Sequence, residues 1–283
     1  MSSKVINSKK QDKGLSRDSI DKFYTKQSVV NQCIKYIKKY INIKEDDLII
    51  EPSAGNGAFL KKIKTIANNY KFYDIIPEND EITKKDFLKF NYDKVLTNYT
   101  NIHIIGNPPF GRQSSLAIQF IKKCCEFAKS ISFVLPKSFK KDSMKKHFSQ
   151  NYHLIFETDL PEKSFLVNDE ETDVPCIFQI WKYKTKKRDI VKKLDPINFK
   201  FVTKLDDPDI SFRRVGVNAG NISVDIKDNS VQSHYFIKFT NKQPLKQNLK
   251  KLKSIEFMGD NTVGPKSISK QELIKEFNKV LTN

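Results

Sequence analysis

Short apolar runs alternate with segments of helical spacing along the first two thirds of the chain. The runs that predict buried strands lie at residues 48–50, 72–73, 102–105, 131–135, 154–156 and 174–181. Residues 28–41 instead repeat apolar side chains every three or four positions, with lysines on the opposite face, and residues 59–66 and 116–127 also have helical character. Strands that alternate with helices predict an α/β fold with a doubly wound, Rossmann-like, mostly parallel sheet.

The pattern changes after Trp181. Residues 182–188 are highly charged, and helical periodicity becomes scarce beyond them. The elements expected there are short strands at residues 222–226 and 235–239 and a final helix at 272–281 that is capped by Ser267 or Ser269. We therefore expect three parts: a flexible basic tail (residues 1–19), an α/β domain (20–185) and a small β-rich C-terminal extension (186–283).

A glycine turn follows the first core strand. Residues 51–59 read Glu-Pro-Ser-Ala-Gly-Asn-Gly-Ala-Phe. Gly55 and Gly57 allow a tight turn and a close approach of the backbone to a ligand, at the strand end where doubly wound sheets bind ligands. A dinucleotide site needs a third glycine, but Leu60 occupies that position. Glu51 suits a positively charged amino group instead.

Two acidic residues follow later strand ends. Asp74 lies about 20 residues after the glycine turn, where carboxylates bind ribose hydroxyls; a solvated turn residue is the alternative. Asp86 can accept from an adenine amine while Phe87 flanks the ring, or the pair forms a surface loop with a core phenylalanine.

The segment Asn107-Pro108-Pro109-Phe110 leaves a buried strand. Two prolines fix φ and remove backbone donors, so the Pro108 carbonyl and the Asn107 side-chain oxygen are free to accept. Two such acceptors suit an exocyclic NH₂ group, whose two hydrogens they bind. Phe110 offers a face on which a planar base can stack.

Together these residues resemble the amino-methyltransferase family, which includes adenine-N6 methyltransferases of DNA and RNA. The family motif (Asp/Asn/Ser)-Pro-Pro-(Tyr/Phe/Trp) stands here as residues 107–110. The resemblance implies a Rossmann-like methyltransferase sheet, S-adenosylmethionine as cofactor, and catalysis by Asn107 to Phe110. The cofactor contacts that it implies are Glu51, Ser53, Gly55, Gly57, Asp74, Asp86, Phe87 and Asn107.

The order of segments is similar to the γ arrangement of these enzymes, in which a C-terminal extension recognises the target. Members of that group carry an upstream Tyr-Thr-Pro segment at the methionine end of the cofactor. This chain has Tyr24 and Thr25 there, with Lys26 in place of proline. The resemblance covers residues 22–183 and implies Tyr24 and Thr25 as further cofactor contacts.

The net charge of +18 favours a polyanionic partner, namely DNA or RNA. Only five basic residues are arginine, which fits an AT-rich coding sequence, but codon bias alone does not create excess positive charge. Lys137 follows a strand at the catalytic edge, and Arg213 and Arg214 are expected in a substrate loop. Lysine-rich solvated surface is the alternative for Lys137.

The cysteines, the histidines and the lengths of the apolar runs bear on metal binding and cellular location. Four irregularly spaced cysteines and four histidines form no metal or disulfide pattern, and no apolar run is long enough to span a bilayer. We expect a soluble intracellular protein, cytoplasmic or nuclear, without metal, and we expect His103 to be a core residue. The first functional hypothesis is adenine-N6 methylation of DNA or RNA. The alternatives are guanine-N2 methylation of RNA, glutamine-N5 methylation of protein, and a catalytically silent nucleic-acid-binding subunit with a protein partner.

Overall fold

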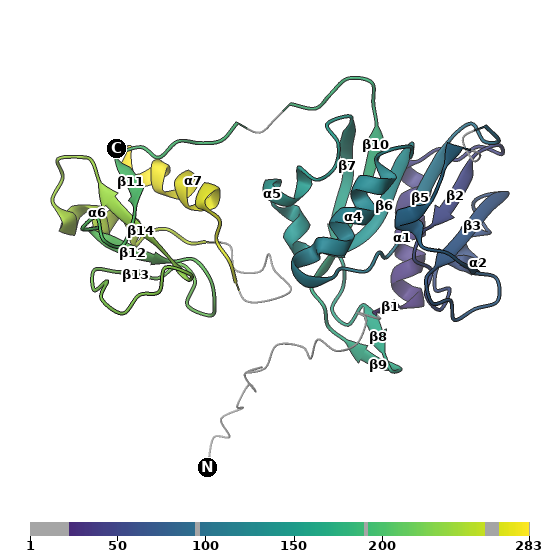
Figure 1. Cartoon of the computed structure of the whole chain (residues 1–283), viewed down its shortest axis with the longest axis horizontal. Coiled ribbons are helices and arrows are strands. Elements are labelled where there is room, and N and C mark those ends of the chain that lie inside the picture. Colours follow the sequence, from purple (N-terminus) through teal and green to yellow (C-terminus); the bar gives the residue numbers. More distant parts are fainter. Residues whose placement is uncertain (1–22, 94–96, 190–191, 258–265, 283) are drawn as a thin grey trace, which may run out of the picture.

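Seven strands of the computed structural model form one sheet in the first two thirds of the chain (Figure 1). Its order is β4-β3-β2-β5-β6-β10-β7, in which β4, β3, β2, β5 and β6 run parallel and β10 is antiparallel to both neighbours. The strands are β2 (Leu48–Glu51), β3 (Asn69–Asp74), β4 (Thr83–Lys84), β5 (Ile102–Gly106), β6 (Ser130–Pro136), β7 (Tyr152–Asp159) and β10 (Cys176–Tyr183). The predicted mostly parallel, Rossmann-like sheet is confirmed.

The structure describes residues 23–93, 97–189, 192–257 and 266–282. The basic tail expected at residues 1–19 lies outside these ranges.

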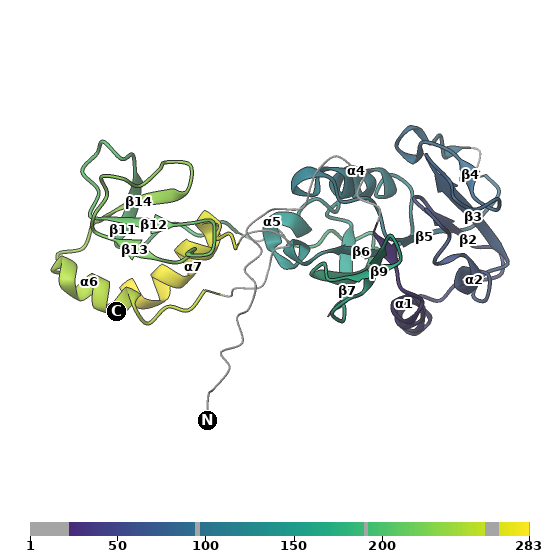
Figure 2. The ribbon, with the colours of Figure 1, turned by 90° about the horizontal axis from the view of Figure 1, so that it is seen from below.

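Helices cover both faces of the large sheet, because its central strands are apolar on both sides. Every residue of β2, β5 and β6 is buried. Figure 2 shows α1 and α2 on one side of the strands and α4 on the other. The helices are α1 (Gln27–Tyr40), α2 (Leu60–Ile63), α4 (Ser115–Cys124) and α5 (Asp142–Lys145), with 3₁₀ turns η1 (Phe87–Lys89), η2 (Arg112–Ser114) and η3 (Lys137–Lys140). Of the helix expected at residues 59–66, only Leu60–Ile63 is helical as α2, because turns precede and follow it.

A small three-stranded sheet lies beside the large one and was not expected. It consists of β1 (Tyr24–Thr25), β8 (Phe165–Val167) and β9 (Glu170–Thr172), in the order β1-β8-β9. Tyr24 pairs with Leu166 and Thr25 with Phe165. The segment before α1 is thus held by a hairpin about 140 residues away.

The C-terminal extension has a sheet and a core of its own. Its antiparallel order is β11-β14-β12-β13. The elements are β11 (Phe199–Val202), β12 (Ile210–Arg213), β13 (Ile222–Ser223), β14 (His234–Phe239), α6 (Leu245–Leu252) and α7 (Lys270–Leu281). One sheet face packs on α7, where Phe199, Phe212 and Phe277 are at most 2% exposed. Of the two predicted cap residues, Ser269 is the one that caps α7, and it forms a capping box with Glu272.

Contacts of Lys141 and of Arg188 connect the extension with the first part of the chain. The Lys141 ammonium donates to the Ser267 carbonyl at 2.7 Å and lies 3.3 Å from the Glu272 carboxylate. Arg188, in the segment that connects β10 to β11, donates to the carbonyls of Lys145 and Phe148. The predicted boundary near residue 185 falls in this segment, and the division into two domains remains a proposal.

Candidate active site

Several of the predicted cofactor and catalytic residues lie at the carboxyl edge of the parallel strands. β2 ends at Glu51 and β5 ends at Gly106, and these neighbours mark the point where the strand order reverses. Ligands of doubly wound sheets bind at such a point. Gly106 has φ of 152°, and a Cβ there would lie 3.3 Å from the Glu51 Cγ. The absence of a side chain at Gly106 therefore allows the ends of β2 and β5 to lie close together.

The glycine turn leaves β2 as predicted. Gly55 and Gly57 have φ of 54° and 86°, in the left-handed region that favours glycine. A Cβ on Gly55 would lie 3.2 Å from the Tyr24 ring. The Gly55 N–H donates to the Asp74 carboxylate at 2.8 Å, so the turn is fixed from β3.

Glu51 is a buried carboxyl group at the centre of this edge. It is 2% exposed, and its Oε2 has no hydrogen-bond partner among the described residues. Burial raises the pKa of Glu51 well above its usual value, and the negative charge of Asp74 adds to this rise. A buried acceptor without a donor is unfavourable, so the site fits a ligand that brings a positive, hydrogen-donating group.

Asn107 has one satisfied and one unsatisfied side-chain atom. Its Nδ2 donates to the Phe23 carbonyl at 2.9 Å, and the Ser53 hydroxyl donates to its main-chain carbonyl at 3.3 Å. The Asn107 Oδ1 is buried without a partner among the described residues. The acceptor that the sequence predicts is therefore present and available.

The chain turns sharply behind this motif. Gly111, Gln113 and Ser114 have φ of 68°, 53° and 62°. A Cβ on Gly111 would lie 2.8 Å from the Leu116 Cγ. The Phe110 carbonyl then accepts from the N–H groups of Leu116 and Ala117 and so joins the turn to α4.

Phe110 is less open than predicted. It is 7% exposed and belongs to the core on the α1 side. The Phe23 ring lies nearly parallel to it, with 6.4 Å between ring centroids and 22° between planes. A base that stacks on the face of Phe110 next to Phe23 would have to displace the Phe23 ring.

The upstream segment also reaches the site. Thr25 is 5% exposed, and its Oγ1 is the third buried side-chain atom here without a partner in the described part of the chain. The Tyr24 hydroxyl donates to Glu78 at 2.6 Å. Tyr24 thus lies against the glycine turn and Phe23 contacts Asn107, while cofactor binding by Tyr24 and Thr25 stays a prediction.

Asp74 has a structural role in addition to the predicted ribose contact. Its two carboxylate oxygens accept from the N–H groups of Gly55 and Ile76, each at 2.8 Å. Each oxygen keeps further acceptor capacity. Ile75 and Ile76 follow it and are 53% and 47% exposed. Sequence reasoning missed these two apolar side chains, although an apolar pair directly after a strand-end acid was a usable signal.

Asp86 and Phe87 serve mainly the local fold. Asp86 begins η1 by accepting from the Leu88 N–H at 3.1 Å and lies 3.3 Å from the Lys89 ammonium. Phe87 is 1% exposed and stacks on Phe90 and Phe120 in the core. The expected contact of the Phe87 ring with a ligand is not supported, because packing already buries it.

The predicted substrate residues are dispersed. Lys137 lies 3.9 Å from Asp159, which pairs more closely with Lys140. Arg213 ends β12 rather than lying in a loop, and its Nε donates to the Val215 carbonyl. The Arg214 guanidinium lies over the Tyr235 ring, 5.5 Å from its centroid. None of the contacts at Asn107 or Glu51 involves these three residues.

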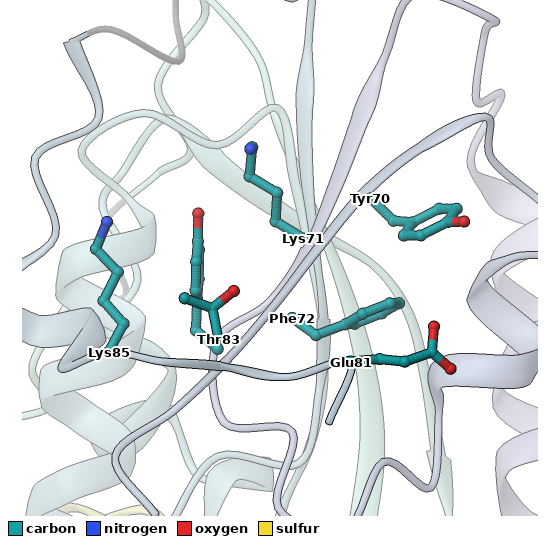
Figure 3. Close-up of a pocket in the computed structure, with 7 residues that line it drawn as sticks. Tyr70, Lys71, Phe72, Glu81, Thr83 and Lys85 are labelled. Carbon is teal, nitrogen blue, oxygen red and sulfur yellow. The ribbon is translucent and has the colours of Figure 1, made fainter. Parts of the chain in front are cut away.

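A polar pocket of about 380 Å³ lies at another edge of the sheet (Figure 3). It is lined by Tyr70, Lys71, Phe72, Tyr73, Glu81, Thr83 and Lys85. Glu81 pairs with Lys64, and the Lys85 ammonium lies over the rings of Tyr73 and Phe90. It contains no predicted site residue. The unpartnered buried acceptors at the carboxyl edge are the stronger indication of a ligand site.

The described residues contain neither a candidate metal site nor a candidate membrane span. No group of histidine, cysteine or acidic side chains in those ranges is arranged to hold a metal ion. None of the helices that the structure describes has the length and apolarity needed to cross a membrane.

Comparison with known families gives one match. The family described as the EDM2 methyltransferase-like domain matches residues 42–187, more than half of the 283-residue chain. The matched region includes the glycine turn, Asp74 and the motif at residues 107–110. No curated protein matches the chain.

Solved structures with a similar arrangement are distant. A Pyrococcus horikoshii protein, provisionally an RNA methyltransferase, has 12% identity and a TM-score of 0.45, covering 60% of this chain and 92% of its own. The methyltransferase subunit of a type I restriction-modification system from Streptococcus thermophilus has 14% identity and a TM-score of 0.45, covering 86% of this chain and 55% of its own. A dimethyladenosine transferase from Plasmodium falciparum has 15% identity and a TM-score of 0.38, covering 58% and 64%.

Proposed function

The chain belongs to the EDM2 methyltransferase-like domain family, and from this membership we propose that it is an active methyltransferase that modifies an exocyclic amino group of nucleic acid. S-adenosylmethionine is the cofactor of methyltransferases with this fold. Adenine N6, in DNA or RNA, is the proposed acceptor. The observation that carries the proposal is that Glu51 Oε2 and Asn107 Oδ1, at the carboxyl ends of the neighbouring strands β2 and β5, are buried without a partner among the described residues.

These residues fit the cofactor. Glu51 offers a buried acceptor to its ammonium group, and Gly55 and Gly57 keep the turn free of side chains. Asp74 remains available to ribose hydroxyls, while the exposed Ile75 and Ile76 provide an apolar surface beside the adenine. When bound, the cofactor supplies a methyl group on a positively charged sulfur. Asp86 stays a candidate for the adenine edge through its remaining acceptor capacity.

Asn107 then acts on the amine that receives the methyl group. Its Oδ1 accepts one amine hydrogen, and the Pro108 carbonyl is proposed to accept the other. These contacts hold the amine in place, and they strengthen as the nitrogen gains positive character, so they favour the transition state over the ground state. Phe110 supports the motif from the core, and the Phe23 ring must turn aside if the base stacks on the Phe110 face next to it.

Nucleic acid is the proposed substrate because of the charge of the chain, +18, and the cations on the extension. Arg213, Arg214 and Lys137 are proposed to contact phosphates, Lys137 after leaving Asp159. Replacement of any one of them with alanine should reduce the slope of log affinity against log salt concentration by roughly one unit.

One experiment tests the reaction. The protein is incubated with isotopically labelled cofactor and, separately, with DNA, RNA and protein, and the labelled residue is identified by mass spectrometry. N6-methyladenosine or its deoxy form supports the proposal. N2-methylguanosine or N5-methylglutamine would redirect it to the alternative acceptors. Nucleic-acid binding without cofactor binding or transfer would contradict it and favour a silent subunit.

A further inference from the structure

The residues before α1 form a strap, residues 23–26, that touches two parts of the site. The Phe23 carbonyl accepts from Asn107. The Tyr24 ring packs at Gly55, and its hydroxyl donates to Glu78. On the other side, β1 pairs with β8, and the Lys26 N–H donates to the Ser164 carbonyl at 3.0 Å. The strap therefore connects the β8–β9 hairpin with the catalytic motif.

The contact at Phe23 determines how the Asn107 amide is turned. A carbonyl oxygen can be approached by the amide NH₂ group but repels the amide oxygen. With the Nδ2 donating to Phe23, the Oδ1 must point the other way, where it is buried and unpartnered. If the amide flipped, the NH₂ group would face the site, and the acceptor that an incoming amine needs would be lost.

Side-chain contacts hold the strap in place. The Phe23 ring packs edge-on against Phe165, which is fully buried, with 6.2 Å between centroids. Lys26 forms an ion pair with Glu171 on β9. Lys163, on the same hairpin, lies 3.9 Å from the other oxygen of Glu171 but is 64% exposed, and no strap contact involves it. Two lysines thus lie next to Glu171, and Lys26 is the one that belongs to the strap.

We propose that the β1–β8–β9 sheet is a positioning element for catalysis, in which the Phe23 carbonyl, held by the Lys26–Glu171 pair, orients the Asn107 amide with its oxygen toward the substrate. This inference rests on the proposed function, because it assigns Oδ1 to the acceptor amine. Phe23, Lys26 and Glu171 act through Asn107 and are positioning residues.

The first test uses charge reversal. Lys26→Glu sets two acids against each other and should loosen the strap. Exposed pairs contribute little, so we expect turnover at saturating cofactor and substrate to fall about three- to tenfold. The double variant Lys26→Glu/Glu171→Lys restores the attraction and should recover most of it. Lys163→Glu, the matched control, makes the same charge change beside Glu171 and should keep the parent turnover.

The second test asks whether the strap acts through Asn107. Asn107→Asp keeps an acceptor but cannot donate to the Phe23 carbonyl. In this background, Lys26→Glu should cause no further loss, since the contact through which it acts is already gone. An equal loss in both backgrounds, parent turnover in Lys26→Glu, or failure of the charge swap to restore turnover would each overturn the inference.

A third measurement does not depend on activity. In the free protein, the Asn107 side-chain NH₂ protons should exchange slowly with water, as measured by NMR, and Lys26→Glu should speed their exchange while Lys163→Glu does not. Unchanged exchange in Lys26→Glu overturns the positioning role. If the parent protein methylates nothing, the proposed function fails, and this measurement still decides whether the strap holds the amide.

Discussion

Two buried polar clusters lie at opposite ends of the same parallel strands, and they differ in one respect. At the amino end, Asp47, His103 and Ser130 are at most 4% exposed. His103 contacts Ser130 at 2.7 Å and Asp47 at 3.1 Å, and Asp47 also accepts from Asn101 and from the Lys44 N–H. At the carboxyl end, Glu51 and Asn107 each keep one atom without a partner in the described residues, as Thr25 does on β1.

The difference separates polar groups that stabilise the fold from groups prepared for a ligand. The amino-end cluster resembles a catalytic triad in composition, but every member has partners within the protein. Burial lowers the pKa of His103 despite the opposing effect of Asp47. We therefore describe the His103–Asp47 contact as a hydrogen bond from a neutral imidazole rather than an ion pair. Of these two clusters, only the one at the carboxyl end keeps buried side-chain atoms without a partner among the described residues; Ser132 on β6 and Arg188, outside both clusters, each keep one as well.

The largest effect is expected for Asn107→Ala. Turnover should fall about 10²-fold or more, as for other preorganised polar groups in active sites. The stability loss should be about 1 kcal/mol, because one hydrogen bond to Phe23 disappears. Single-turnover methyl transfer and urea unfolding measure the two quantities. Near-parent turnover would place the chemistry elsewhere.

Asp47→Ala should show the opposite profile. Three donors lose their acceptor in the interior, so the free energy of unfolding should fall by about 2–3 kcal/mol. Turnover of the folded fraction should stay close to that of the parent. Urea titration, with turnover measured well below the unfolding midpoint, checks both. A tenfold fall in turnover would show that the amino-end cluster is not purely structural.

Glu51→Gln should weaken cofactor binding without weakening the fold. Loss of a charged acceptor for the ammonium group corresponds to about 1.5–3 kcal/mol in affinity, while an amide is easier to bury than a carboxylate. Calorimetry should also show that the parent releases protons on binding cofactor, because the positive charge of the ligand lowers the raised pKa of Glu51. The variant should release fewer. Equal affinity in the two proteins would remove Glu51 from the site.

The smallest effect concerns acid stability. The pKa of His103 is lowered by burial, with further lowering from Lys182 and Lys129. The folded state thus binds its proton less readily than the unfolded state. The stability that neutral His103 contributes is fully present above its usual pKa of 6.5. It is lost as pH falls through the lowered pKa. His103→Gln should therefore lose less stability than the parent as pH falls below 6.5. Parallel pH profiles would exclude His103 as the titrating group.

Local patterns allowed the large sheet, α1 and α4 to be predicted, and they are also the basis of the proposed site residues. Buried parallel strands appear as apolar runs, and glycine turns and the residues 107–110 carry their chemistry in consecutive positions. The β8–β9 hairpin was missed because Phe165, Leu166 and Val167 are its only apolar run, amid several acids, and its partner β1 has two residues.

Long-range partners explain the other differences. Nothing near Asn107 in the sequence indicates that Phe23 binds its amide, since 84 positions separate them. The position of Lys137 beside Asp159 and the burial of Phe87 by Phe120 likewise depend on how distant strands and helices pack. Such contacts decide which polar atoms remain available, and a single sequence does not reveal them.

The left-handed residues Gln113 and Ser114 bear on how this protein could evolve under heat. A non-glycine residue in this conformation carries strain of about 1 kcal/mol or more, so glycine at either position would relieve it. Glycine would also make the turn behind the motif more mobile. Populations selected for thermostability alone should therefore acquire glycine at position 113 or 114, whereas selection for methyl transfer should oppose it. Competition between the two selections would reveal how far the rigidity of this turn serves the motif.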